Sequence, residues 1–128
     1  MSCGNTPTIS FTGSDAQLVV GDHVQTSNAK VTTATAYARG DLLILSDVNV
    51  LTLATDPKIW NVIAVETITA AQATAMAAAG TEYAVYNQGE FDVTQCSLGG
   101  VKLTAGAQQT NARARGTMIN IELRKVGG

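Results

Sequence analysis

The chain has 128 residues, a length typical of one domain with its own core. Eight basic and ten acidic residues give a net charge of −2, which argues against a phosphate-binding surface. Aromatic residues make up only 5%, so the core must be built mainly from Ala, Val, Leu and Ile. Charged residues make up 14%, where about a quarter is usual. A surface this poor in charge favours an interface with another protein.

Residues 1–35 are rich in Gly, Ser, Thr and Asn and predict an N-terminal arm, followed by a β-rich domain over 36–128. Apolar and polar residues alternate near position 10, and a second apolar patch precedes the turn-like Gly21. Such an arm becomes ordered on a partner, although a frayed terminus is the alternative. The candidate partner-binding residues of the arm are Ile9, Phe11, Leu18 and Val20.

Strand patterns follow in the first half of the domain. β-Branched residues alternate over 30–35 and predict a strand that begins inside the arm's last residues. The apolar run 42–45 predicts a strand buried on both faces, and 50–54 is its expected hairpin partner. Residues 59–65 form the most apolar stretch and are the predicted central strand.

The period then changes from that of a strand to that of a helix. Thr69 and Gln72 have the spacing of a capping box, in which each side chain bonds the other residue's backbone amide. Residues 70–79 are nearly all strong helix formers, and Gly80 stands where a C-terminal cap glycine belongs. We therefore expect a helix over 70–79.

A β-hairpin is predicted over 81–93. Two alternating runs flank Asn87, Gln88 and Gly89, and Gly89 would take the positive-φ position of the turn. Tyr86 and Phe91 should fix this hairpin to the core, with Trp60 packed nearby.

The C-terminal part predicts a helical turn within 94–100, a short strand over 101–103 and a polar loop over 105–116. Residues 117–124 alternate as a closing strand with Ile119, Ile121 and Leu123 inward. The predicted structural core therefore includes Trp60, Tyr86, Gly89, Phe91, Ile119 and Ile121.

The residues suggest no enzyme, metal site or cofactor. His23 is the only histidine and lies in the arm, without ligand spacing around it. Cys3 and Cys96 are too few and too far apart for a disulfide framework or a zinc motif, and are expected to be reduced thiols in a cytosol. The carboxylates occur singly and are interpreted as solvated turn residues. No apolar run reaches the ~20 residues of a membrane span, and no secretory signal is present.

The order of several segments resembles the lambda-type phage head-decoration (capsid cement) proteins. These segments are Tyr37 with Gly40-Asp41-Leu42-Leu43, Trp60-Asn61-Val62-Ile63-Ala64, the alanine-rich helix, Val85-Tyr86-Asn87-Gln88-Gly89-Glu90-Phe91, and Gly116-Thr117-Met118-Ile119-Asn120-Ile121. Together they span about 35–124. The chain departs from the pattern at Asn61, where relatives usually carry glycine, and lacks the tryptophan often found after the hairpin.

The resemblance implies a mainly β fold of the β-clip type, either a small barrel or a sandwich, with one or two short helices. It implies a homotrimer at local threefold positions of the expanded phage head, where it stabilises the shell against internal DNA pressure. The partner is the major capsid protein, against which the arm orders, and no nucleic acid or membrane is contacted directly. The expected location is the capsid exterior of a virion assembled in the bacterial cytoplasm.

Three alternatives remain from the sequence. The first is another small β virion component, such as a head-tail connector or tail protein. The second is a trimeric β-clip nucleotide pyrophosphatase, which would need acidic metal ligands and base- and phosphate-binding motifs that the sequence does not show. The third is a nucleic-acid-binding β-barrel, which the net charge and the few aromatic residues disfavour.

Overall fold

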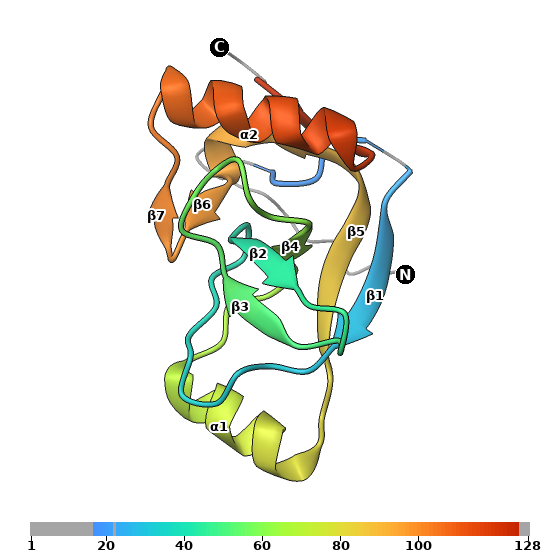
Figure 1. Cartoon of the computed structure of the whole chain (residues 1–128), viewed down its shortest axis with the longest axis vertical. Coiled ribbons are helices and arrows are strands. Elements are labelled where there is room, and N and C mark those ends of the chain that lie inside the picture. The colour runs from blue at the N-terminus through green and yellow to red at the C-terminus, as the bar shows by residue number, and fades with distance from the viewer. Residues whose placement is uncertain (1–16, 22, 126–128) are drawn as a thin grey trace, which may run out of the picture.

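A computed structural model describes residues 17–21 and 23–125. The fold is mainly β, as predicted. Figure 1 shows helix α1 and helix α2 at opposite ends of a curved sheet. The strands are β1 (Gln25–Ala29), β2 (Leu42–Leu45), β3 (Leu51–Leu53), β4 (Val62–Ala64), β5 (Tyr83–Asp92), β6 (Ser97–Leu98), β7 (Val101–Lys102) and β8 (Ile121–Arg124). The helices are α1 (Ala70–Ala79) and α2 (Ala107–Met118), with a 3₁₀ turn η1 (Val93–Gln95).

The main sheet has the strand order β1-β5-β4-β2-β3, and β8 pairs in parallel with the second half of β5. Its two edges curl toward each other at Lys30. The Lys30 amide donates to the Asn49 carbonyl at 2.9 Å, and the Leu51 amide donates to the Lys30 carbonyl at 2.9 Å. Only this isolated bridge joins β1 to β3 among the described residues, so the sheet is strongly curved but is not a closed barrel.

Both faces of the sheet are buried, because successive side chains along a strand point to opposite faces. Leu42 and Ile63 face one core, whereas Leu43 and Val62 face the other. The α2-side core comprises Leu18, Leu42, Ala54, Trp60, Ile63, Tyr86, Phe91, Val93, Cys96, Leu103, Ala112, Ile121 and Leu123. The α1-side core comprises Ala29, Val31, Tyr37, Leu43, Leu51, Val62, Ala64, Ile68, Ala73, Tyr83 and Val85.

Several local predictions are confirmed. The Thr69 hydroxyl accepts from the Gln72 amide at 3.1 Å, the Thr69 amide donates to the Gln72 side chain at 2.8 Å, and α1 ends at Gly80 with φ 71°. Strands β2 and β3 form the expected antiparallel hairpin, and β4 holds the centre of the sheet. The short strand β7 lies in its predicted segment, and the helical turn η1 begins one residue before the segment predicted for it.

The predicted hairpin over 81–93 is wrong, because β5 runs without reversal from Tyr83 to Asp92. The two halves of this strand have different neighbours. The first half pairs with β1 and β4, and the second half pairs with β8. Gly89 lies where the pairing partner of β5 changes to β8, and its φ is 144°. A Cβ at this position would stand 2.9 Å from Val24 Cγ2 and 3.1 Å from Phe91 Cζ. The glycine therefore permits a bend and a close approach inside one long strand, not a turn.

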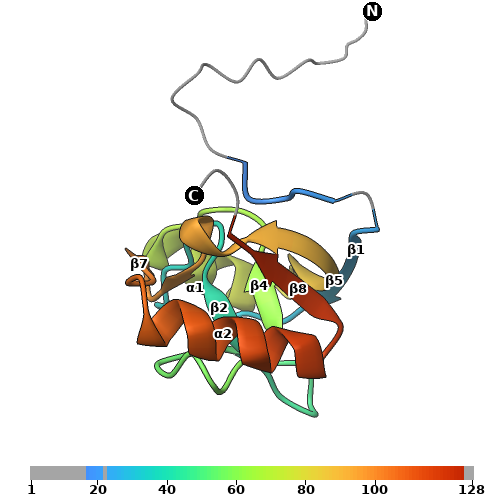
Figure 2. The same cartoon turned by 90° about the horizontal axis from the view of Figure 1, so that it is seen from above.

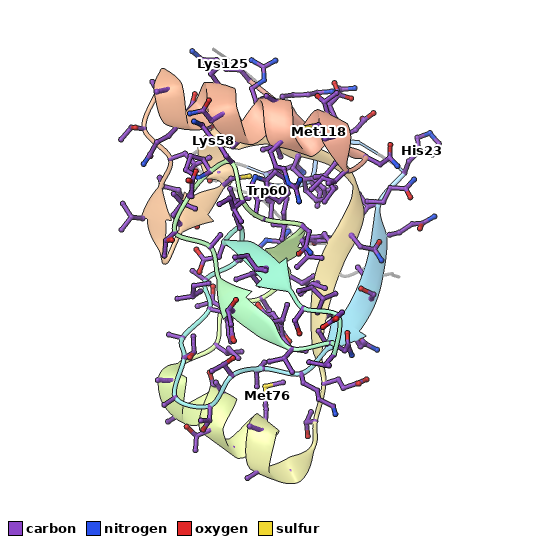
Figure 3. All side chains as sticks on the ribbon, viewed as in Figure 1. His23, Lys58, Trp60, Met76, Met118 and Lys125 are labelled. Atoms are coloured by element: carbon purple, nitrogen blue, oxygen red, sulfur yellow. The ribbon has the colours of Figure 1, made fainter. Side chains whose placement is uncertain are left out.

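The predicted loop over 105–116 is wrong, because these residues form most of α2. The helix buries only two small side-chain positions, Ala112 and Gly116, so it lacks the apolar stripe that would reveal it. Its arginines attach it instead: Arg113 Nε donates to the Leu123 carbonyl at 2.9 Å, and Arg115 Nε donates to the Trp60 carbonyl at 2.8 Å. Figure 3 shows Trp60 directly below this helix.

The closing strand is shorter than predicted. It begins at Ile121, since Thr117 belongs to α2 and Ile119 caps its C-terminal end. Ile119 is half-buried against the α2-side core, and Asn120 turns the chain with φ 64°. Ile121 is buried, as predicted.

The predicted boundary between arm and domain at residue 35 is too late. The strand in this region is β1, which lies before the expected 30–35 and has a polar sequence without apolar alternation. Within 30–35, Ala34 has φ 57°, which is not a strand conformation. Ala29 and Val31 are buried in the α1-side core. Strand β1 forms because its backbone completes the hydrogen bonding of β5, which side-chain patterning does not report.

Phe91→Ala should reduce the free energy of unfolding by about 3–5 kcal/mol, since the ring is fully buried and packs at a tilt against Tyr86, with 5.0 Å between centroids. Urea denaturation measures this loss. Gln88→Ala, at an exposed position of the same strand, is the control and should change stability little. Equal losses for the two variants would contradict the placement of β5.

Gly89→Ala should destabilise the protein by about 1–3 kcal/mol, because it combines an unfavourable backbone conformation with a steric overlap. Gly99→Ala is the matched control, since Gly99 also has positive φ, at 57°, but has no atoms near its Cβ position. We expect thermal unfolding to show the larger loss for Gly89→Ala. A larger loss for Gly99→Ala would contradict a bend enforced by packing.

Candidate interaction surface

The described part of the N-terminal segment lies along the second half of β5 (Figure 2). The Val20 amide donates to the Glu90 carbonyl at 3.0 Å, and the Asp92 amide donates to the Leu18 carbonyl at 2.8 Å. The Leu18 side chain is only 4% exposed and belongs to the α2-side core, whereas Val20 is half-buried. Leu18 therefore anchors the segment and is not available to a partner, which corrects its assignment to a free arm.

The other two predicted arm residues, Ile9 and Phe11, lie outside the described residues. Of the predicted structural residues, Trp60, Phe91 and Ile121 are brought together with Tyr86 in one core. Trp60, Tyr86 and Phe91 support the surface from within, whereas Ile121 and Gly89 also line the groove described next.

A polar groove of about 520 Å³ lies where the strand that pairs with β5 changes from β1 to β8. Arg124 Nη2 lies 3.0 Å from Glu90 Oε1, and its Nε lies 3.4 Å from Glu122 Oε2. Arg124 therefore forms ion pairs with both carboxylates of the groove. Figure 3 shows His23 beyond the end of α2 that carries Met118. The lining consists of His23, Gln88, Gly89, Glu90, Gly116, Thr117, Asn120, Ile121 and Glu122.

A second hollow of about 220 Å³ is lined by Leu18, Arg39, Gln95 and Lys102. It differs from the larger groove because its charged side chains are both cations. Sequence reasoning missed Arg39 and Lys102 as a pair, since the residues around each of them form no binding motif and the two side chains meet only through the tertiary fold. The rarity of cations in the chain is the one signal that draws attention to them.

Asp41 is buried, at 1% exposure, and corrects the interpretation of every carboxylate as a solvated turn residue. Its Oδ1 accepts from the Ser97 hydroxyl at 2.5 Å and from the Gly100 amide at 2.8 Å, and its Oδ2 accepts from the Ala38 amide at 2.9 Å. The carboxylate thus joins the turn before β2 to the β6–β7 hairpin. Three donors satisfy a charge that would otherwise be costly to bury.

Asp92 is the second buried carboxylate. Its Oδ1 accepts from the Thr94 amide at 2.9 Å and from the Thr94 hydroxyl at 2.7 Å, which caps η1. Asp47, Glu66, Glu82 and Glu122 are exposed, in agreement with the solvated interpretation.

Two buried groups have raised pKa values. Burial raises the pKa of the Cys96 thiol to about 12. Burial also raises the pKa of the Tyr83 hydroxyl, which bonds the backbone of Glu66. A thiol that holds its proton so strongly is not an activated nucleophile, and Cys96 is therefore a packing residue.

Within residues 17–21 and 23–125, no group of three or more His, Cys, Asp or Glu side chains is placed to hold a metal ion. No helix in that part of the chain combines the length and apolar character needed to cross a membrane. The chain matches no protein-family model, and no characterised protein matches it in sequence. The described surface offers a polar groove and a smaller hollow with two cations, and residues of the anchored N-terminal part of the chain line both.

The raised pKa of Cys96 predicts a loss of stability in alkali. Between about pH 9 and 12 the folded state keeps a proton that the unfolded state releases, so the free energy of unfolding falls as pH rises through this window. The loss should be about 1–2 kcal/mol at pH 10. Urea denaturation at pH 8 and pH 10 measures it.

The comparison needs Cys3→Ser as the parent, so that Cys96 is the only thiol. Cys3→Ser/Cys96→Ala should lose less stability between the two pH values than this parent. Identical losses would show that Cys96 does not hold its proton more strongly in the folded state.

Proposed function

We propose that this protein is a structural component of a phage head, a trimeric decoration protein that acts by binding alone. It sits at local threefold positions of the expanded head, contacts the major capsid protein and stabilises the shell against internal DNA pressure. The observation that carries the proposal is the order of the motifs over residues 35–124, now joined to their positions in the fold.

The residues that carry the resemblance meet in space. Tyr86 and Phe91 pack in a tilted arrangement within the α2-side core, which also contains Trp60. A Cβ at Gly116 would stand 2.2 Å from the Ile121 carbonyl oxygen and 3.5 Å from Trp60. Segments far apart in the sequence therefore depend on one another for packing. A resemblance on such residues supports a shared fold, and through it the proposed function.

The N-terminal segment supplies the proposed means of attachment. Its described part is fixed to β5 by backbone hydrogen bonds and by the buried Leu18 side chain. A pull on the residues that precede this part would therefore be transmitted to the core. Ahead of it, Ile9 and Phe11 alternate with polar residues in the sequence. Such a pattern suits addition of a strand to an exposed sheet edge, where the backbone gives affinity and apolar side chains fill pockets.

Trimerisation explains how a weak segment can give firm attachment. Ordering a free segment on a partner costs several kcal/mol, so one arm alone binds weakly. Three arms on one trimer make the second and third contacts intramolecular, and avidity can then exceed single-arm affinity by ~10²–10⁴. The low content of charged residues agrees with a surface shared between subunits and shell.

Deleting residues 1–15 should leave a folded trimer that no longer stays on expanded heads, because the deletion ends before the anchored Leu18. Light scattering gives the oligomeric state, and co-sedimentation with decoration-free expanded capsids gives binding. Ile9→Asp and Phe11→Asp should weaken binding without lowering the melting temperature, while Ser10→Asp is the control on the opposite face. A truncated chain that binds as tightly as the full chain would place the interface on the β body.

A further inference from the structure

The hollow lined by Leu18, Arg39, Gln95 and Lys102 presents two cations to solvent and no carboxylate. Among the described residues, neither Arg39 nor Lys102 forms an ion pair, and the bonds of both go to neutral oxygens. In a chain with eight basic residues, two unpaired cations at one small hollow are a concentrated charge. The hollow therefore has the electrostatic character of an anion site.

Arg39 is held in one orientation. Its Nη1 donates to the Val65 carbonyl at 2.7 Å and to the Tyr86 hydroxyl at 3.1 Å, and its guanidinium carbon lies 5.8 Å from the centre of the Tyr86 ring. These bonds occupy Nη1 alone. The edge formed by Nε and Nη2 keeps three N–H donors, in the geometry that binds a carboxylate through two parallel bonds. A fixed guanidinium loses little freedom on binding.

Lys102 is brought to the same hollow by Gln95, whose carbonyl accepts from Lys102 Nζ at 2.9 Å. That carbonyl also lies against Gly40, where a Cβ would stand only 2.4 Å away. Asp41, the next residue, bonds Ser97 and Gly100. The turn that carries Arg39 and the hairpin that carries Lys102 are therefore joined by the buried carboxylate.

We infer that this hollow receives an aspartate or glutamate side chain of the protein on which the chain docks. The carboxylate pairs with the Nε–Nη2 edge of Arg39 and with Lys102 Nζ. Asp41 and Asp92 are buried carboxylates close in sequence to residues that line the hollow, and each has its own donors. They reduce the local potential but do not line the hollow, so the cations face the incoming group.

A protein carboxylate fits better than a nucleic acid. Binding to a phosphate backbone needs several cations in a row, whereas this chain carries a net charge of −2 and offers two cations at a single point. Leu18, which lines the hollow, also belongs to the segment that leads from residues 1–15. A partner engaged by those residues would come to lie beside the hollow, and in this respect the inference rests on the proposed function.

The first experiment tests the hollow without any capsid. The full chain, labelled with ¹⁵N, is titrated with N-acetylglutamate, with inorganic phosphate, and with sodium chloride at matched ionic strength. We expect a saturable shift of the Arg39 Nε–H resonance and of the amides around Gln95 with N-acetylglutamate, which Lys102→Gln weakens. A shift with phosphate alone, or shifts that sodium chloride reproduces, would overturn the inference.

The second experiment measures binding to expanded heads. Lys102→Gln removes one cation, whose only hydrogen bond to the described residues goes to the Gln95 carbonyl, and Arg39→Gln removes the other. Each should weaken co-sedimentation by about tenfold at low salt, with unchanged trimer mass. The control is Lys58→Gln, which removes an exposed lysine outside the hollow (Figure 3).

Arg39→Gln also loses the contact with Tyr86, so its melting temperature is measured beside that of Lys102→Gln, which makes no such contact. Parent-like binding by Lys102→Gln and Arg39→Gln would overturn the docking role of the hollow while leaving the proposed function intact. If the unaltered chain binds no heads, the proposed function fails, and the N-acetylglutamate titration still decides whether the hollow takes a carboxylate.

Discussion

The buried carboxylate of Asp41 is the interaction on which the arrangement of this surface depends. A charge removed from water is tolerated only when hydrogen bonds replace its hydration, and here the donors come from Ala38, Ser97 and Gly100. The Ala38 amide fixes the turn before β2, and the other two donors belong to the β6–β7 hairpin. This side chain, with the bond from the Ser97 amide to the Gly40 carbonyl, joins the turn before β2 to the β6–β7 hairpin, which belongs to a different sheet. The turn carries Arg39 and the hairpin carries Lys102, so this connection brings the segments of both cations together.

Strand β5 is the second constraint. It is long enough to belong to both ends of the molecule, because its first half sits between β1 and β4 and its second half pairs with β8. Side-chain alternation sends Val85 to the α1-side core and Tyr86 to the α2-side core. The two cores are therefore built on one strand, and Gly89 supplies the bend where the neighbours change. The N-terminal segment also joins the fold along this strand, through the bonds of Leu18 and Val20 to Asp92 and Glu90.

The elements that could be predicted from the sequence are those whose causes are local. A capping box and a terminal glycine define α1 within a few residues, and the apolar runs of β2 and β3 are separated by a short turn. The misses have non-local causes. Strand β1 is polar and forms because β5 offers it backbone partners, while α2 is fixed by two arginines that bond carbonyls of distant segments. Asn87-Gln88-Gly89 has a turn-like composition, but Gly89 instead lies inside β5, where it allows the close approach of Val24 and Phe91.

The distinction between local and non-local causes also applies to the candidate surface, which consists of the N-terminal arm and the hollow with two cations. An apolar alternation such as Ile9 and Phe11 is visible in the sequence, since a strand needs nothing beyond that period to present one apolar face. A pair such as Arg39 and Lys102 is not visible, because the two residues are far apart in the sequence and their segments are joined only in the fold, where Asp41 bonds Ser97 and Gly100. The inferred recognition of a carboxylate depends on this joining of the two segments, because each cation is then held by bonds of its own, Arg39 to Val65 and Tyr86 and Lys102 to Gln95. Apolar contacts of an arm would then supply affinity, and the charged hollow would fix the orientation in which the body comes to rest.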